Sequence, residues 1–174
     1  MGHYDSSYEF KPKAATPEDL AHYDSIWKRY NGIMKERKGD ITSIQSGLII
    51  HQVNCQHTMG SGVALAIRNK WPAVFEEYKN IHSPQLGQVQ FVQVTPRILI
   101  ANLFGQEYYG RSGERYTSYD ALDEGFKTIA ARTDENLPIH LPLIGCGLGG
   151  GKWPIVRAII MEHLKGRDLT LWQF

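Results

Sequence analysis

Two glycine-rich segments carry the clearest chemical signal in this sequence. The first covers residues 145–151 (GCGLGGG), after an apolar run and ahead of a helix-like segment that begins near Pro154. Because glycine has no Cβ, backbone N–H groups in such a segment can approach an anion, and the start of a helix adds partial positive charge. The segment therefore predicts a loop that binds a diphosphate. The alternative is a flexible turn without a ligand, which the backbone entropy of so many glycines disfavours.

The same residues contain the letters G-x-G-x-x-G, from Gly145 to Gly150, which mark dinucleotide-binding Rossmann units. In those units the motif opens the fold, and a later strand ends in an acidic residue that binds the ribose. Here only one more helix and one more strand are expected before Phe174. A P-loop is disfavoured as well, because Lys152 precedes Trp153 instead of Ser or Thr.

The second glycine-rich segment covers residues 54–62 (NCQHTMGSG) and also joins an apolar run to a helix-like segment. Two such loops can face one ligand, so that their backbone N–H groups cover a diphosphate from both sides. Asn54 and Ser61 then offer side-chain hydrogen bonds to a sugar. We therefore expect both loops to belong to one site, although Asn54 on its own is also a common turn residue.

Two histidines near the second segment are candidates for acid–base chemistry. An imidazole with an ordinary pKa can activate water or protonate a leaving oxygen at neutral pH. His51 is the first candidate and His57 the second, and Asn54 completes the candidate catalytic set. The alternatives are a buried core histidine for His51 and a solvated loop residue for His57. Cys146 is not expected to be a nucleophile, because its loop would hold the diphosphate rather than the leaving group.

The composition disfavours several function classes. Nineteen Lys and Arg against eighteen Asp and Glu give a formal net charge of +1, which provides no overall field for holding a nucleic-acid backbone. No apolar run approaches the roughly 20 residues of a membrane span. The two cysteines form neither a disulfide framework nor a paired metal-ligand spacing. We expect a monomeric cytoplasmic protein without a metal or cofactor, bound to neither membrane nor nucleic acid.

Alternating strand-like and helix-like segments must position these loops, and they predict one α/β domain with three layers and a mixed sheet. Residues 1–15 look like a polar arm, and a helix is expected from the N-cap Thr16 to about Arg29 as an addition to the domain. We therefore divide the sequence into an arm and added helix (1–32) and a main domain (33–174). The main domain should contain strands at 48–53, 89–95, 98–103, 139–144 and 169–174, and helices at 63–70, 73–80, 117–133 and 154–164.

Three motifs, in order over residues 33–174, resemble the macrodomain family. They are Gly39-Asp40-Ile41-Thr42, then Val53-Asn54 with Met59-Gly60-Ser61-Gly62-Val63-Ala64, and Leu141-Pro142-Leu143-Ile144-Gly145-Cys146-Gly147-Leu148. The sequence is most similar to the branch that contains a fungal ADP-ribose 1''-phosphate phosphatase, phage-encoded relatives and the terminal ADP-ribose protein glycohydrolase. If phage-encoded, the protein is expected in the host cytoplasm.

The resemblance implies a three-layer α/β/α sandwich with ADP-ribose in a cleft at the strand ends. Asp40 would accept a hydrogen bond from the adenine amino group beside Ile41, Asn54 would contact the distal ribose, and Phe104 would form a wall of the pocket. For Asp40 and Phe104 the alternatives are a turn cap and a core residue. The loop 105–116 either folds over the adenosine or is an ordinary exposed loop. The residues implied at the diphosphate are Gly60, Ser61, Gly62, Val63, Ile144, Gly145, Cys146, Gly147, Leu148 and Gly149.

The activity implied by the resemblance is hydrolysis of ADP-ribose 1''-phosphate to ADP-ribose and phosphate, with His51 placed as in the phosphatase. The glycohydrolase of this branch uses a lysine near the end of the corresponding strand and an aspartate directly after the glycine loop. This sequence has Phe104 or Gly105 and then Gly149 at those positions. Removal of ADP-ribose from protein carboxylates by that route is therefore disfavoured. The alternatives are a non-catalytic reader of ADP-ribose, free or protein-linked, and an ADP-ribosyl hydrolase acting on a modified protein or nucleic acid.

Overall fold

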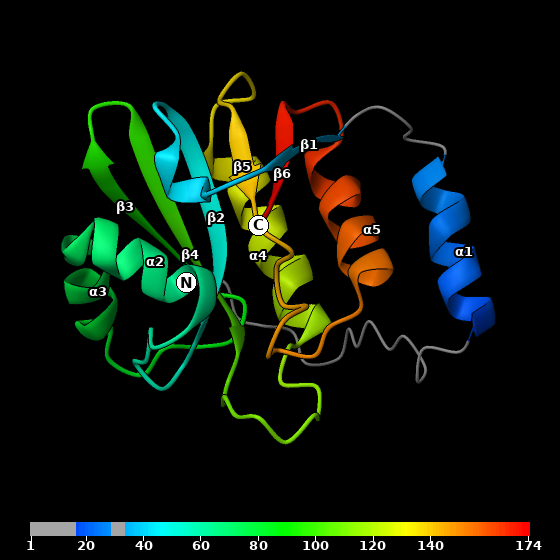
Figure 1. Ribbon diagram of the computed structural model, residues 1–174, viewed down its shortest axis with the longest axis horizontal. Helices are drawn as coiled ribbons and strands as arrows, with labels where there is room; N and C mark the ends of the chain where they lie inside the picture. Colours follow the sequence, from blue (N-terminus) through cyan, green and yellow to red (C-terminus); the bar gives the residue numbers. More distant parts are fainter. Residues whose placement is uncertain (1–16, 29–33) are drawn as a thin grey trace.

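A six-stranded mixed sheet runs through the protein, in the strand order β1-β6-β5-β2-β4-β3 (Figure 1). The computed structural model describes residues 17–28 and 34–174, so the predicted arm and its N-cap Thr16 lie outside the described residues. All neighbouring strands are parallel except β3, which runs antiparallel to β4 at one edge. The strands are β1 (Met34–Lys38), β2 (Gly47–Asn54), β3 (Val89–Thr95), β4 (Ile98–Gln106), β5 (Ile139–Leu141) and β6 (Leu169–Gln173).

Helices cover both faces of this sheet, which confirms the predicted three-layer α/β architecture (Figure 1). One face carries α4 (Tyr119–Arg132) and α5 (Trp153–Leu164). The other carries the short 3-10 helix η1 (Ile41–Ser43), α2 (Gly62–Lys70) and α3 (Pro72–Lys79). The added helix α1 (Pro17–Lys28) lies beside α5.

The central strand β2 divides the apolar core into two clusters. Leu48 and Ile50 pack on the side of α4 and α5, whereas Ile49 and Val53 pack on the side of α2 and α3. Both faces of β2 are therefore buried, which is why its sequence is a continuous apolar run instead of an alternating one. Successive residues at the end of this strand must also point to opposite faces.

The observed elements follow the predicted ones closely, except that β1 has no counterpart among the predicted strands and that two differences lie next to the predicted loops. β4 continues to Gln106 because Phe104 and Gln106 still pair with β2. β5 ends at Leu141, well before Ile144, because Pro142 has no N–H to donate to a neighbouring strand. No helix among the described residues is long and apolar enough to cross a membrane.

Candidate ligand-binding cavity

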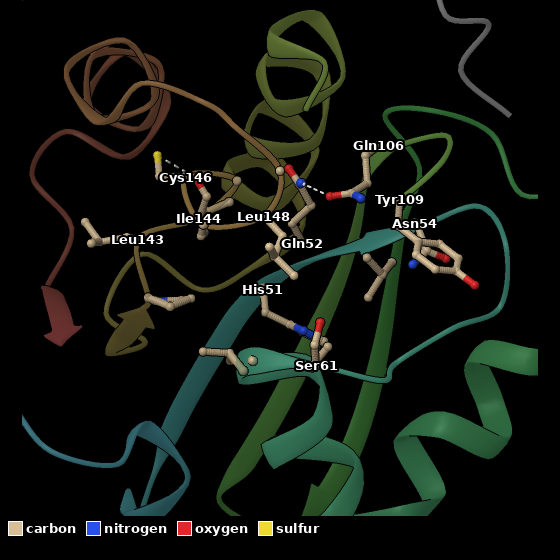
Figure 2. A pocket seen from close by; sticks show the side chains of 18 of the residues that line it. His51, Gln52, Asn54, Ser61, Gln106, Tyr109, Leu143, Ile144, Cys146 and Leu148 are labelled. Carbon is tan, nitrogen blue, oxygen red and sulfur yellow. Dashed lines mark hydrogen bonds between the residues drawn. The ribbon is translucent and has the colours of Figure 1, made fainter. Parts of the chain in front are cut away.

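A cavity of about 840 Å³ lies at the carboxyl ends of the central strands, within the usual size range of ligand pockets (Figure 2). Its walls come from the end of β2, the start of α2, the loop 107–116, the residues after β5 and the end of the chain. We call residues 54–62 the asparagine loop and residues 144–151 the glycine loop. Every sequence-predicted site residue lines this cavity except Asp40, His57 and Phe104.

Asn54 builds the asparagine loop with its own side chain. Its Oδ1 accepts hydrogen bonds from the N–H groups of Gln56 (2.9 Å) and Thr58 (3.3 Å), and its Nδ2 donates to the carbonyl of Thr58 (2.9 Å). The hydroxyl of Tyr78, on α3, lies 2.7 Å from the Asn54 carbonyl oxygen and 2.8 Å from Oδ1. Asn54 therefore fixes the path of the loop, and its contact with a ribose stays a prediction.

The asparagine loop ends at the N-terminus of α2, which faces the cavity. Ser61 is the N-cap residue of α2, yet its side chain makes no capping hydrogen bond. Gly60, Ser61, Gly62 and Val63 all line the cavity. The first N–H groups of a helix have no partner inside the helix and carry partial positive charge. This end of α2 can therefore bind an anion.

The glycine loop lies on the opposite wall and leaves several of its N–H groups unused. Its two ends are tied together by the Gly151 N–H, which donates to the Gly145 carbonyl (2.7 Å). Within residues 17–28 and 34–174, the N–H groups of Gly147, Leu148 and Gly149 donate to no protein group. Free N–H groups on a loop that lines a cavity are suited to bind phosphate oxygens.

His51 is buried in the wall between these loops with only 1% of its surface exposed. Its Nε2 lies 2.5 Å from Oδ1 of Asn102, whose Nδ2 donates to Oε1 of Gln90 (3.0 Å). This arrangement makes Nε2 the protonated nitrogen, and Nδ1 has no hydrogen-bond partner among the described residues. Burial lowers the pKa of His51 to about 4, against the opposing effect of the Asn102 hydrogen bond. The imidazole is therefore neutral at pH 7 and can accept a proton but not donate one as an imidazolium.

Comparison with known proteins identifies the family. The Macro domain family model matches residues 50–160 of the chain. The chain is a macrodomain. An uncharacterised 17.5 kDa protein from enterobacteria phage T4 is 30% identical over 153 residues, which are 80% of this chain and 95% of the phage protein.

Solved structures agree with this assignment. A protein of unknown function from Bacteroides thetaiotaomicron is 34% identical with a TM-score of 0.69, over 83% of this chain and 100% of that one. A macrodomain protein from Streptomyces coelicolor is 30% identical with a TM-score of 0.64, over 81% and 99% of the two chains. The structure of Thermosipho africanus DarTG in complex with ADP-ribose shares the fold at 15% identity, with a TM-score of 0.63 over 79% of this chain and 41% of that one.

Two named enzymes also match the chain. The DNA ADP-ribosyl glycohydrolase of Thermus aquaticus is 26% identical over 149 residues, which are 79% of this macrodomain but only 39% of that protein. The ADP-ribose 1''-phosphate phosphatase of Aspergillus clavatus is 34% identical over 67 residues, which are 38% of this chain and 34% of that one.

Two residues predicted for the macrodomain site do not line the cavity. His57 lies outside the cavity, where its Nε2 is 2.8 Å from the carbonyl oxygen of Ile81 and its ring meets Tyr78 edge-on. Phe104 is fully buried against Tyr78, with 5.8 Å between ring centroids, and forms no wall of the cavity. Phe104 points into the core beneath α3 because the alternation of β4 places it on that face.

Asp40 has the capping role that the sequence offered as the alternative to an adenine contact. Its Oδ1 accepts hydrogen bonds from the N–H and the hydroxyl of Thr42, both at 2.8 Å, so Asp40 caps η1. Gly39 and Ile41 on either side of Asp40 line the cavity, but Asp40 does not. Its contact with an adenine therefore stays a prediction.

Sequence reasoning missed Gln52 and Gln106. Both line the cavity, and Nε2 of Gln52 donates to Oε1 of Gln106 (2.6 Å), as Figure 2 shows. A Cβ on Gly105 would overlap the Gln52 carboxamide, and a Cβ on Gly149 would overlap the hydroxyl of Thr117. Gln52 and Thr117 therefore fill the space beside Gly105 and Gly149. The sequence signal that could have identified Gln52 is a glutamine inside a largely apolar strand.

Cys146 lines the cavity as a neutral thiol. Its Sγ–H donates to the Ile144 carbonyl (3.2 Å), and burial raises the pKa of Cys146 to about 12, although Lys152 acts in the opposite direction. A thiolate is therefore not available at pH 7. Potential metal ligands also meet among the described residues, in a group that lies outside the cavity: Asp123, Glu162 and His163.

Proposed function

We propose that this macrodomain binds ADP-ribose 1''-phosphate and hydrolyses its terminal phosphate monoester to ADP-ribose and phosphate. The observation that carries the binding part is the pair of facing loops with unused N–H groups on one cavity. The N-terminus of α2 supplies one group of donors and residues 147–149 supply the other. A diphosphate between them would receive hydrogen bonds from both walls, as preorganised amide donors favour an anion.

The titratable groups of the cavity limit the chemistry. Among the described residues, the cavity lining contains no Asp, Glu or Lys. Among these lining residues only His51 carries an imidazole, and its unprotonated Nδ1 is a proton acceptor; because less than 1 Å² of this atom is exposed, a water reaches it only after a local movement of the cavity wall. In the proposed reaction a water attacks phosphorus, the bond from phosphorus to the ribose oxygen breaks, and the proton of the water passes to Nδ1. The departing ribose oxygen takes its proton from solvent, and Nδ1 returns the proton it has accepted to solvent, so that His51 acts only as a base.

The similarity to the Aspergillus phosphatase supports this choice of substrate over a limited stretch of sequence. The close packing of Gln52 on Gly105 and of Thr117 on Gly149 supports the same choice of substrate indirectly. A side chain at either position would overlap Gln52 or Thr117, so a lysine–aspartate pair has no room there without rearrangement. A glycohydrolase reaction through such a pair is therefore disfavoured.

The second candidate is recognition or release of ADP-ribose attached to a macromolecule. Exposed large apolar side chains favour it, because among the described residues these gather around the cavity. An apolar rim of this kind is typical of an interaction surface. Its members are Tyr109, Leu143, Leu148 and Phe174, which line the cavity, and the adjoining Tyr108.

A substrate panel separates these functions. The purified protein is incubated without added metal with ADP-ribose 1''-phosphate, an ADP-ribosylated DNA oligonucleotide and an ADP-ribosylated protein, and the products are separated by chromatography. We expect phosphate and ADP-ribose from the first substrate only. ADP-ribose from the second or third substrate would replace the proposal by the second candidate. Binding of ADP-ribose without any turnover would make the protein a reader.

A further inference from the structure

Thr117 forms hydrogen bonds to both ends of the segment 145–149 of the glycine loop, which contains the unused N–H groups of residues 147–149. Thr117 does not itself line the cavity. It is only 2% exposed and lies just before α4. Its hydroxyl donates to the Gly145 carbonyl (2.8 Å), and its backbone N–H donates to the Gly149 carbonyl (3.0 Å). The segment 145–149 is therefore anchored at its first and last residue by one side chain and its own backbone.

The glycines of the loop fit Thr117 closely. A Cβ on Gly145 would lie 2.8 Å from Cγ2 of Thr117, and a Cβ on Gly149 would overlap its hydroxyl oxygen. A Cβ on Gly147 would meet no atom of the described residues within 4 Å. The glycines at 145 and 149 are therefore needed for the approach of Thr117 as well as for any ligand, while Gly147 lies in open space.

Gln52 extends this anchor to the rest of the cavity. Its Nε2 donates to the hydroxyl oxygen of Thr117 (2.9 Å) and to Oε1 of Gln106 (2.6 Å), whose Nε2 donates to the Tyr108 carbonyl (2.8 Å). Thr117 also pairs with Gln106 as an isolated antiparallel bridge. The hydroxyl of Thr117 therefore joins the glycine loop to β2 and to the loop 107–116, which are two other walls of the cavity.

We propose that Thr117 is a positioning residue for ligand binding. Its hydroxyl keeps the glycine loop in the conformation that leaves the N–H groups of residues 147–149 free for a diphosphate. A loop ordered before binding loses less conformational entropy on binding, which strengthens affinity without a direct contact. The proposal rests on the proposed function only for the identity of the ligand.

The first test measures the order of the loop without any ligand. Thr117→Val removes the hydroxyl at nearly constant volume, and Thr117→Ser keeps it. Thr133→Val is the matched control, because the Thr133 hydroxyl also donates to a backbone carbonyl (2.6 Å) and also accepts a side-chain hydrogen bond, from Arg167 (2.9 Å), but lies at the C-cap of α4, away from the glycine loop. The readout is amide hydrogen exchange at Tyr116 and Gly151, whose N–H groups bond to carbonyls of the glycine loop. We expect exchange at least about tenfold faster in Thr117→Val, since the hydrogen bonds to Gly145 and from Gln52 are both lost and a single buried hydrogen bond already corresponds to about that factor. We expect wild-type rates in the other two variants, and wild-type exchange in Thr117→Val would overturn the proposal.

The second test is calorimetric titration with ADP-ribose. Thr117→Val should bind about tenfold more weakly than the wild type, whereas Thr117→Ser and Thr133→Val should bind equally well. Weaker binding with unchanged exchange would contradict positioning, because the hydroxyl would then act on the ligand directly. Absence of phosphate release by the wild type would remove the phosphatase proposal and leave both of these results standing. If the wild type does not bind ADP-ribose, the ligand assignment falls and the exchange rates decide about Thr117.

Discussion

Nε2 of His51 and Oδ1 of Asn102 lie 2.5 Å apart in the protein interior, and this contact determines which nitrogen of the imidazole is free. Asn102 is fully buried, and its Nδ2 is already engaged with Gln90. Its Oδ1 must therefore accept from His51, which leaves Nδ1 as the unprotonated nitrogen. A protonated His51 would place a second, unpartnered N–H and a positive charge in the same interior.

The buried imidazole predicts that the macrodomain loses stability in mild acid. Burial holds the pKa of folded His51 at about 4, against 6.5 when it is unperturbed. The unfolded chain therefore binds a proton at a pH where the folded protein does not, and the stabilising contribution is complete above pH 6.5 and falls between pH 6.5 and 4. The loss should approach about 3 kcal/mol at pH 4. Urea unfolding at several pH values measures it.

His51→Asn is the comparison for that experiment. His140 also has a lowered pKa, caused first by burial, so the wild type alone reports both residues. The difference in unfolding free energy between wild type and His51→Asn should shrink as the pH falls from 6.5 to 4. A difference that does not change with pH would mean that His51 is not the titrating group.

The glycine loop gives a matched pair of substitutions. Gly149→Ala should destabilise the protein by roughly 1–3 kcal/mol, because the new Cβ would overlap the Thr117 hydroxyl. Gly147→Ala should change stability by less than about 0.5 kcal/mol, because its Cβ would meet no atom within 4 Å. Thermal unfolding compares the two variants. Equal effects would show that Thr117 does not pack against position 149 as described.

The hydroxyl of Tyr78 supports the asparagine loop. It accepts a hydrogen bond from the Thr58 N–H (3.0 Å) and lies within reach of both oxygens of Asn54. Tyr78→Phe should therefore cost about 1–3 kcal/mol of unfolding free energy and weaken ADP-ribose binding, since it leaves buried polar groups unpaired. Tyr108→Phe, at an exposed tyrosine, should leave stability unchanged. Chemical denaturation and calorimetry test both, and an unperturbed Tyr78→Phe would remove the supporting role.

The sequence predicted the parts of this site that depend on local spacing. A glycine-rich segment between a strand and a helix identifies a loop at the strand ends, and residues 60–63 and 144–149 of the two segments do line the cavity. Their contact with a diphosphate stays a prediction. The side chains of buried strands were harder to place. Phe104 is on a strand covered on both faces, so apolar character does not tell which face it joins.

Long-range polar contacts were not predictable from spacing. Gln52 and Thr117 are 65 positions apart in the sequence and meet only because β2 and the segment before α4 are adjacent in the fold. The position of His57 in a cavity-lining loop suggested that its side chain enters the cavity. Its ring instead contacts the carbonyl of Ile81, just after α3. Such contacts depend on tertiary packing that no local pattern contains.

The most direct test of the proposed function is phosphate release from ADP-ribose 1''-phosphate by wild type and His51→Ala, with ADP-ribose binding measured on the same samples. The account predicts saturable release by the wild type, a loss of about 10²- to 10⁴-fold in His51→Ala, as for removal of a general base, and similar ADP-ribose affinity in both. His57→Ala should retain release, because His57 lies outside the cavity. Undiminished release by His51→Ala, or no release by the wild type, would contradict the account.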